Sequence, residues 1–411
     1  MLIAVPCWAA EFDFRLKWFA TRSALPSHDI QRPVTSTPTT EQSFDLRTLW
    51  RHTSGQFRWL VDHSAVVLQG DALALGRQPG SMVEQPVTSD MRRAWDLTWE
   101  INEGARHASF HRLDRLALQW QPGNWSITVG RQAVSWGSGI VFQPLDLFSP
   151  FAPTVVDRDY KAGDDLVLID RLLSNGHDLQ MLHIVRRDLR GERAARVGST
   201  AVKWHGAVGA LELEGVAAKH FDAPVVGGSL RMPLGLAMLR ADVVATRAAQ
   251  ERAGQEQWRV SGILNTDISF TIGERNAYAF AEYFHNDWGV ERLPLNIADL
   301  PSALQDRLAR GEVFNLMRDY MALGGSFEWH PLVNHSVTLI TNLHDSSSLL
   351  QMQINYEPSD RQRVQLGWLQ PLGGRGDEFG GVPVVPSPLQ PTQALTTGGA
   401  TRIYVRWSLY L

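Results

Sequence analysis

The sequence predicts an all-β fold, a closed antiparallel transmembrane β-barrel of about 16–18 strands with one in-folded segment and one short loop helix. Two observations lead to this prediction. The last eleven residues alternate apolar and polar side chains up to the final residue, and similar short stretches recur along the chain between Gly- and Pro-bearing turns. A side-chain period of two is that of a β-strand with one apolar and one polar face.

The terminal stretch, residues 401–411, also indicates why the barrel should be closed. Its apolar face carries Ile403, Val405, Trp407, Leu409 and Leu411, and its polar face carries Arg402, Tyr404, Arg406, Ser408 and Tyr410. An unpaired edge strand this apolar would template aggregation. A bilayer admits a sheet only when the sheet closes, because no backbone group may stay unpaired there. An interior strand of a soluble β-sandwich is the alternative.

Composition supports a barrel over a helical membrane protein. The chain has 411 residues, of which 44% are hydrophobic, yet it contains no run of about 18 apolar residues that could form a spanning helix. Its 15 Trp residues suit the aromatic belts that barrels place at the two membrane interfaces. The net charge of −4 argues against nucleic acid as a partner.

The first ten residues, MLIAVPCWAA, resemble the end of a signal peptide, with Ala9 or Ala10 before a plausible cleavage point. No positively charged region precedes them, so we expect a remnant of such a peptide; an ordinary N-terminal strand is the alternative. Residues 11–411 are then a single barrel domain. Because Cys7 is the only cysteine, this domain has no thiol, which suits an oxidising envelope compartment.

The alternating stretches give the expected strands in chain order. They are 11–18, 44–51, 56–62, 64–73, 95–102, 113–121, 125–129, 165–172, 178–187, 197–205, 210–219, 227–232, 234–246, 257–271, 277–288, 321–329, 337–343, 350–356, 364–368 and 401–411. Residues 299–309 predict the short helix, with Asp299 as a candidate N-cap, leucines at helical spacing and Gly311 after the end. The stretch 372–401, rich in Gly, Pro and Thr, predicts a long outer loop.

Two segments resemble known barrel families. The terminal strand resembles the C-terminal recognition strand of gram-negative outer-membrane barrels, which usually ends in an aromatic residue, whereas this chain ends in Tyr410-Leu411. Residues 130–153, GRQAVSWGSGIVFQPLDLFSPFAP, resemble the Gly-Arg-Gln, Trp-Gly and Pro-x-Asp pattern of porin-like and alginate-export-like barrels. The resemblance implies a place in the bacterial outer membrane, contact with the lipid bilayer and lipopolysaccharide, recognition of residues 402–411 by the barrel-assembly machinery, and a possible homo-oligomer.

The segment 130–161 is the candidate functional site. Gly130, Gly137 and Gly139 allow sharp bends, and the Pro-rich run 144–153 cannot pair as a central strand. We therefore expect this segment to leave the wall and fold into the lumen or over one mouth, where fixed charges select solutes. The candidate constriction residues are Arg131, Gln132, Trp136, Asp146, Asp157, Arg158, Asp159 and Lys161. The alternative is that the charged residues pair with one another and hold the segment in place.

These features predict a passive channel for small polar or anionic solutes, narrowed by residues 130–161, rather than an enzyme. The scattered histidines predict no metal site, and no cofactor motif is present. Three alternatives remain: a non-conducting structural or assembly partner of an envelope complex, an outer-membrane hydrolase, and a soluble secreted β-protein whose Trp and Leu faces pack on each other. The hydrolase would use His344 with Asp345 and the serines Ser346 to Ser348, adjacent residues that more often form a turn.

Overall fold

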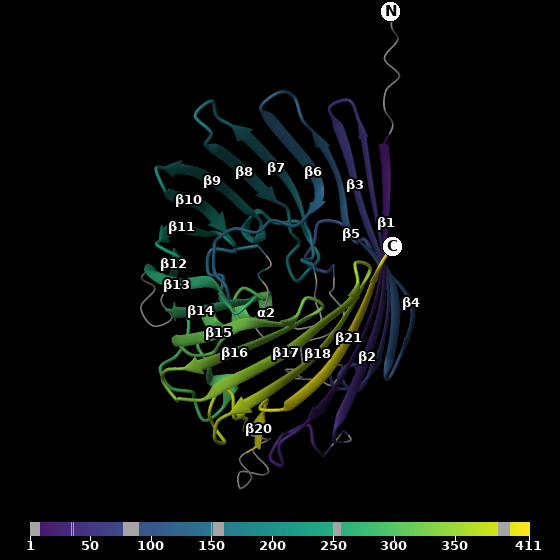
Figure 1. Ribbon diagram of the computed structural model, residues 1–411, viewed down its shortest axis with the longest axis vertical. Coiled ribbons are helices and arrows are strands. Elements are labelled where there is room, and N and C mark those ends of the chain that lie inside the picture. The colour runs from purple at the N-terminus through teal and green to yellow at the C-terminus, as the bar shows by residue number, and fades with distance from the viewer. Residues whose placement is uncertain are drawn as a thin grey trace, which may run out of the picture.

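A computed structural model of the chain describes residues 9–33, 35, 37–76, 90–148, 150, 160–249, 256–384 and 395–411. It is built almost entirely of β-strands (Figure 1). The elements are β1 (Ala9–Ala24), β2 (Thr39–Ser54), β3 (Phe57–Gly70), α1 (Asp71–Gly76), β4 (Thr98–Gly104), β5 (His107–Trp120), β6 (Trp125–Gln132), β7 (Asp164–Leu172), β8 (Asp178–Ile184), η1 (Ala195–Val197), β9 (Ser199–Val208), β10 (Leu211–His220), β11 (Ala223–Leu234), β12 (Ala237–Ala249), β13 (Glu256–Ile272), β14 (Arg275–Asn286), η2 (Ile297–Asp299), α2 (Ser302–Arg310), β15 (Asp319–His330), β16 (Val333–Asn342), β17 (Ser348–Ser359), β18 (Gln362–Leu372), β19 (Val382–Val384), β20 (Leu395–Thr397) and β21 (Thr401–Tyr410).

The strands close into an antiparallel barrel, as the sequence predicts. Eighteen of them form the ring, in the order β1, β2, β3, β5 to β18 and β21, and β4 is one extra strand that pairs with β5. The last strand, β21, pairs with β18 on one edge and with β1 on the other. No edge of the terminal strand is therefore left unpaired, which is the remedy that its apolar pattern requires.

The two faces of β21 are those predicted from the alternation. Tyr404 and Ser408 point inward and are 3% and 5% exposed, whereas Ile403 and Leu411 on the outward face are each 61% exposed. The neighbouring strand β1 continues this pattern, because the registered pair Trp18 and Trp407 lies on the outward face. The alternation in the sequence thus marks an inside and an outside of the barrel.

The outward face of the barrel is apolar and aromatic. Exposed aromatic side chains lie close to the strand ends, and they include Phe12, Phe57, Trp59, Trp99, Trp120, Trp125, Trp258, Phe270, Trp329 and Tyr356. Some of them stack on each other across strands, as Phe57 and Trp120 do with ring centroids 6.3 Å apart. The alternative of a soluble β-protein required these faces to pack on each other, whereas the side chains are exposed and are not packed between two sheets.

The connections differ in length at the two ends of the barrel. One end, which we call the terminal rim, carries the start of β1 and the end of β21, and its turns are short: the β2–β3 turn occupies residues 55–56 and the β13–β14 turn residues 273–274. Gly55 and Gly273 supply the left-handed backbone of these turns, with φ of 59° and 61°. The opposite end, the loop rim, carries the long connections, among them residues 287–318 with α2.

Two local predictions need correction. Residues 56–62 and 64–73 were predicted as two strands but form one strand, β3, followed by α1; a bulge opposite Asp62 and His63 disturbs the register with β5 at the predicted break. Asp299 was predicted as the N-cap of the helix, but it ends the short η2 turn, and Pro301 holds the N-cap position of α2. The predicted end is confirmed, since Gly311 closes the helix with φ of 68°.

The predicted signal-peptide remnant falls mostly on residues 1–8, which lie outside the described residues. Its last two residues, Ala9 and Ala10, are the first residues of β1 and face Thr53 and His52 of β2.

No helix in the described part of the chain is long and apolar enough to cross a membrane.

Candidate functional site

The wall of the barrel changes composition where the in-folded segment begins. β6 is short: it pairs with residues 116–120 of β5 and ends at Gln132. Nearer the loop rim, residues 107–112 of β5 pair instead with β4, which residues 90–97 precede. Gly130 makes this departure possible: its φ is 131°, and a Cβ there would lie 2.1 Å from the carbonyl oxygen of Leu116.

Arg131 joins the parts of the wall that meet at this point. Its guanidinium donates to Asp165 of β7 from Nε at 2.8 Å, to Asp90 at 3.0 Å and to the Trp95 carbonyl oxygen at 2.6 Å. Its side chain is only 1% exposed. All three guanidinium nitrogens therefore donate within the protein. Arg131 links the start of the in-folded segment to β7 and to residues 90–97.

The first part of the in-folded segment, residues 133–148, lies along the inner wall of β7–β12. Trp136, Leu145 and Phe148 pack against apolar inward positions such as Leu182 and Val225. Trp136 is 4% exposed, and its indole N–H donates to Gln180 of β8 at 3.1 Å. An apolar patch inside a barrel would be costly if water covered it, so the segment and this patch stabilise each other.

Two carboxylates on the inner wall hold the middle of the segment. Asp242 of β12 accepts from the backbone N–H and the hydroxyl of Ser138, at 2.7 and 2.6 Å. Glu282 of β14, which is fully buried, accepts from the consecutive backbone N–H groups of residues 140–142 at 2.7, 3.0 and 2.7 Å, and from the amide of Asn265 at 2.9 Å. Charge-assisted bonds of this kind satisfy the backbone of a segment that pairs with no strand.

A buried ion pair closes the in-folded segment on itself. The Lys161 ammonium group contacts the Asp146 carboxylate and donates to the Val134 carbonyl oxygen at 3.1 Å. Asp146 is 2% exposed. Burial raises the pKa of Asp146 to about 6, although the nearby Lys161 ammonium opposes that shift.

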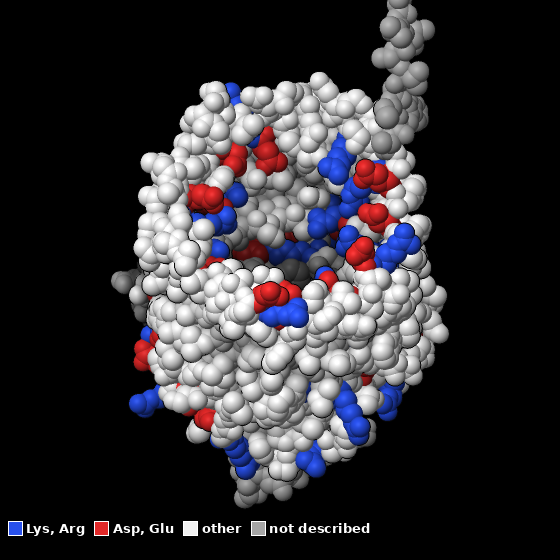
Figure 2. Space-filling view, in the orientation of Figure 1, with Lys and Arg blue, Asp and Glu red and all other residues white. Residues whose placement is uncertain are grey.

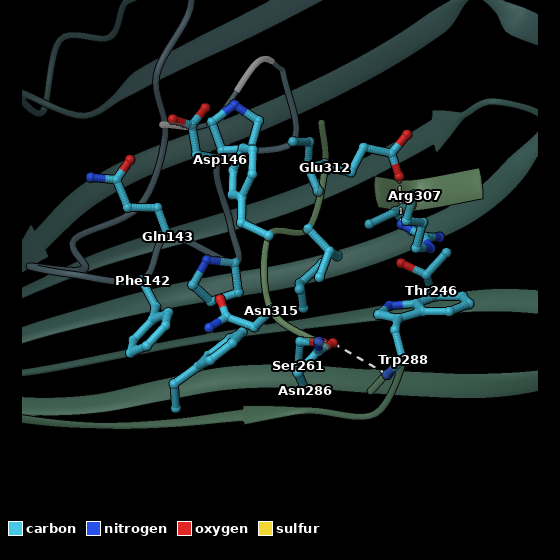
Figure 3. Close-up of a pocket in the computed structure, with 18 of the residues that line it drawn as sticks. Phe142, Gln143, Asp146, Thr246, Ser261, Asn286, Trp288, Arg307, Glu312 and Asn315 are labelled. Carbon is cyan, nitrogen blue, oxygen red and sulfur yellow. Dashed lines mark hydrogen bonds and ion pairs between the residues drawn. The ribbon is translucent and has the colours of Figure 1, made fainter. Parts of the chain in front are cut away.

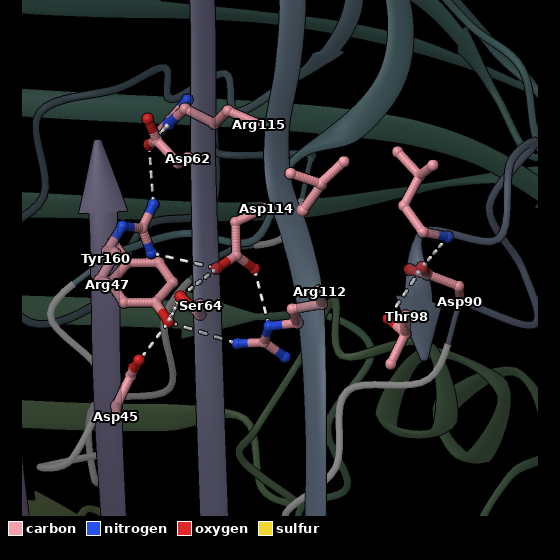
Figure 4. A network of polar contacts seen from close by, with 12 residues as sticks. Asp45, Arg47, Asp62, Ser64, Asp90, Thr98, Arg112, Asp114, Arg115 and Tyr160 are labelled. Atoms are coloured by element: carbon pink, nitrogen blue, oxygen red, sulfur yellow. Dashed lines mark hydrogen bonds and ion pairs between the residues drawn. The ribbon is translucent and has the colours of Figure 1, made fainter. Parts of the chain in front are cut away.

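On the opposite wall, Tyr160 enters a cluster of arginines and aspartates on β2, β3 and β5 (Figure 4). Its hydroxyl donates to Asp45 at 2.9 Å, and its ring lies 3.3 Å beneath the guanidinium carbon of Arg47. Arg47 in turn donates to Asp62 at 2.8 Å and to Asp114 at 3.1 Å. The in-folded segment thus contacts the inner wall on two sides, because residues 140–142 bond to Glu282 of β14 and Tyr160 contacts Asp45 and Arg47 of β2.

This arginine cluster, defined as Arg47, Arg51, Arg112 and Arg115, carries more positive than negative charge. Its four guanidinium groups form ion pairs with two carboxylates, Asp62 and Asp114. A third carboxylate, that of Asp45, is linked through the Tyr160 hydroxyl, which donates to Asp45 and accepts from Arg112. Arg51 and Arg115 both bond to Asp62 and keep side-chain exposures of 18% and 20%. Figure 2 shows basic and acidic side chains gathered together around the hollow of the barrel. The cluster can therefore attract an anion that enters the lumen.

A small cavity separates the in-folded segment from α2 near the loop rim (Figure 3). It has a volume of about 70 Å³ and is lined by Phe142, Asp146, Asn286 and Trp288, among others. The connection after α2 is fixed here, because Glu312 forms an ion pair with Arg307 and its Oε1 lies 3.3 Å from His220 Nε2. Burial favours the protonated form of Glu312, but His220, Arg307 and Arg310 outweigh it and lower the pKa of Glu312 to about 2.

The candidate residues predicted from the sequence do not gather at one point. Trp136, Asp146 and Lys161 lie in the segment on the inner wall, whereas Arg131 is buried at the wall junction. Gln132 ends β6, and its side-chain oxygen accepts from Arg115 at 3.4 Å. The remaining three candidates, Asp157, Arg158 and Asp159, lie outside the described residues.

Neither the arginine cluster nor the two anchoring carboxylates, Asp242 and Glu282, was predicted from the sequence. A signal for the cluster was present, since Asp45, Arg47 and Arg51 occupy alternate inward positions of a strand whose outward positions include Phe44 and Leu46. Glu282 gave no such signal, because its partners are backbone groups far along the chain.

The residues of the hydrolase alternative do not form a serine–histidine–aspartate relay in the described part of the chain, because His344 bonds away from Asp345 and its serines. His344 bonds through Nε2 to the Asp319 carboxylate at 2.8 Å, and His285 bonds through Nδ1 to the same carboxylate at 2.7 Å. Asp345 instead accepts from the backbone N–H and hydroxyl of Ser347, at 2.9 and 2.7 Å. This arrangement is that of a turn.

The fold and its in-folded segment define a porin-like barrel. Among solved structures, Acinetobacter baumannii OccAB1 is similar, with 8% identity, a TM-score of 0.55 and coverage of 98% of this chain and 96% of that chain. Two from Pseudomonas aeruginosa, OpdK with vanillate and OccK2 (OpdF) in complex with glucuronate, each have 12% identity, a TM-score of 0.52 and coverage of 98% of both chains. Another structure of OpdK describes it as an outer membrane protein.

These likenesses confirm the porin-like fold expected from residues 130–153 and 401–411, but the alginate-export-like resemblance finds no support in them. No protein-family model matches the sequence. No curated protein matches it either.

Proposed function

We propose that this chain is a passive channel of the bacterial outer membrane for small polar or anionic solutes. The observation that carries this proposal is the arginine cluster, which lies inside a closed barrel whose outer face is apolar. Lipid suits the outward face, and the aromatic side chains near the strand ends suit its two interfaces. An excess of fixed positive charge beside the lumen favours anions over cations.

The in-folded segment supplies the constriction in this proposal. Its residues 133–148 lie along the inner wall as far as β14, and Tyr160 contacts the arginine cluster. A solute that passes the barrel then moves between this segment and the wall. The likeness to OpdK with vanillate and to OccK2 with glucuronate supports small carboxylates as the solutes, because vanillate and glucuronate are both carboxylates.

Uptake into proteoliposomes tests this function. We expect the purified protein to admit glucuronate faster than glucosamine, since the two sugars are similar in size and opposite in charge. Glucose provides a neutral reference. Uptake is followed as the rate at which the liposomes swell in each solute. If they swell no faster than protein-free liposomes for every solute, the channel is rejected and the non-conducting partner of an envelope complex is favoured.

Other expectations stay predictions. They concern recognition of residues 402–411 by the barrel-assembly machinery, contact of the loop rim with lipopolysaccharide, and self-association. Within the proposed orientation the terminal rim, with its short turns, faces the periplasm.

A further inference from the structure

The inner wall has a stretch of neutral polar side chains that the arginine cluster does not explain. The inward positions of β15 to β17 follow from the strand registers. Near the terminal rim most of them are occupied by hydroxyl and amide side chains: Ser326, Asn334, Ser336, Thr338, Gln351, Gln353 and Asn355. All of them are partly exposed. Glu328 is a charged residue on the same face, and it bonds to Arg275 and Asn276 of β14. Uncharged donors and acceptors in a lumen suit solutes that carry hydroxyl groups.

A network that begins at Tyr404 orders part of this stretch. Tyr404 of β21 is registered with Gly367 of β18, which is registered with Gln353 of β17. A Cβ at Gly367 would lie 2.1 Å from the Tyr404 ring, so the ring lies over the space that the glycine leaves. The Tyr404 hydroxyl can therefore reach across β18 and donate to Gln353 Oε1 at 2.7 Å.

The direction of the remaining bonds follows from that donation. Because Gln353 Oε1 accepts, its Nε2 is free to donate, and it does so to Asn355 Oδ1 at 2.8 Å. Gln365 Nε2 donates to the same Asn355 oxygen at 2.6 Å. The Asn355 side-chain oxygen therefore accepts two hydrogen bonds, and the two N–H donors of its amide take no part in these bonds.

Two groups of this network have no hydrogen-bond partner among the described residues. They are the Nδ2 donors of Asn355, which is partly exposed, and Oε1 of Gln365, whose side chain is 5% exposed in total. Asn355 and Gln365 are registered partners on β17 and β18. An ordered donor beside an ordered acceptor matches a hydroxyl group, which can accept one bond and donate another.

We propose that Asn355 and Gln365 form a solute contact that recognises hydroxyl groups, so that the channel favours small polyhydroxylated carboxylates such as sugar acids. This inference rests on the proposed channel function and deepens it. The carboxylate is attracted toward the basic side of the lumen, where β21, β1 and β2 place Arg406, Arg15 and Arg47 inward. The hydroxyl groups meet the amide network on β17 and β18.

The test compares two ring carboxylates that differ in their hydroxyl groups. Glucuronate and cyclohexanecarboxylate each carry one negative charge on a six-membered ring. We expect glucuronate to block single-channel current at a concentration lower by about three- to tenfold, as one or two added hydrogen bonds would give. Equal blocking concentrations for the two solutes would overturn the proposal.

Variants locate the contact. Asn355→Leu combined with Gln365→Leu should remove the difference between the solutes and leave KCl conductance in place; Asn355→Ala is a milder version in case the double variant does not fold. Gln119→Leu is the matched control, because it changes an inward amide on β5, and it should keep the difference. A difference that survives in Asn355→Ala would also overturn the proposal.

Calorimetric titration of the detergent-solubilised protein with both solutes separates this inference from the channel function. Preferential binding of glucuronate by a protein that never conducts would reject the channel and retain the contact. Conduction with equal binding of the two solutes would reject the contact and retain the channel.

Discussion

Arg131 and Asp165 form a buried ion pair, with Nε and Oδ1 2.8 Å apart and each side chain 1% exposed. The pair lies where β6 leaves the wall, so the residue that begins the in-folded segment is bound to the strand that follows it. A channel built this way depends on interactions that lie in the wall and away from the solute path.

Arg131→Met should destabilise the barrel by about 3–5 kcal/mol, because it leaves the buried carboxylate of Asp165 without its ion-pair partner. Urea unfolding of the protein in liposomes, followed by Trp fluorescence, measures the change. Arg196→Met is the control: it removes an ion pair with Asp188 whose arginine is 65% exposed, and it should cost less than about 1 kcal/mol. Equal effects of the two variants would contradict the junction role.

Glu282→Gln should loosen the in-folded segment and raise the single-channel conductance. Glutamine can accept only through one oxygen, and its amide group opposes the backbone donors of residues 140–142. Glu212→Gln alters an inward carboxylate that is 54% exposed and should change conductance much less. A Glu282→Gln channel with unchanged conductance would mean that the segment does not narrow the lumen.

The connection between β18 and β21 should be held more tightly in acid than in base. Glu378 accepts from the Leu316 backbone N–H, the Tyr320 hydroxyl and the Asn342 amide, and burial raises its pKa to about 7 from the usual 4.5. The docked state then binds the extra proton between pH 4.5 and 7. Docking is strongest below that window and weakens by up to about 3 kcal/mol as pH rises through it.

A spin label at Arg375→Cys, an exposed residue of this connection, measures the docking. In a chain with Cys7 replaced by Ser, the label should be more mobile at pH 8 than at pH 5. Glu378→Gln should abolish the pH dependence, and Glu291→Gln, which changes a carboxylate that is 64% exposed, should keep it. Mobility that rises toward acid would have the wrong sign.

Removing two accessible arginines should reduce the preference for anions. Arg51→Gln with Arg115→Gln takes two positive charges from the arginine cluster and leaves Asp62 paired with Arg47. The reversal potential in a KCl gradient should shift toward that of a cation-selective pore. Arg196→Gln, on the connection before β9, should leave the potential unchanged, and a shift of equal size there would show that the cluster is not the selectivity element.

The sequence predicted the parts of this fold that depend on local pattern. The alternation of residues 401–411 placed Tyr404 inward and Ile403 outward, and Gly130 with the Pro-rich run marked the point where the chain leaves the wall. Gly311 marked the end of α2. Each of these features is set by neighbours in the chain, through side-chain period, backbone freedom or the loss of a donor.

The interactions of the candidate site could not be predicted in the same way. Arg47 meets Asp114 only because β2, β3 and β5 pair in one register, and the bulge beside Asp62 decides which side chains of β5 point inward. Arg131 was predicted near the pore because the Gly- and Pro-bearing segment that it begins was expected to leave the wall. Its partners Asp90 and Asp165 come from segments that only the closed wall brings together.

Single-channel recording of the refolded protein in a planar bilayer tests the channel and its constriction most directly. The wild-type protein should give stable ohmic steps with a reversal potential that favours anions, and Glu282→Gln should give larger steps. Insertion without conductance, verified by protease protection of the embedded strands, would contradict the channel. Conductance that is identical in the two proteins would contradict the constriction by residues 133–148.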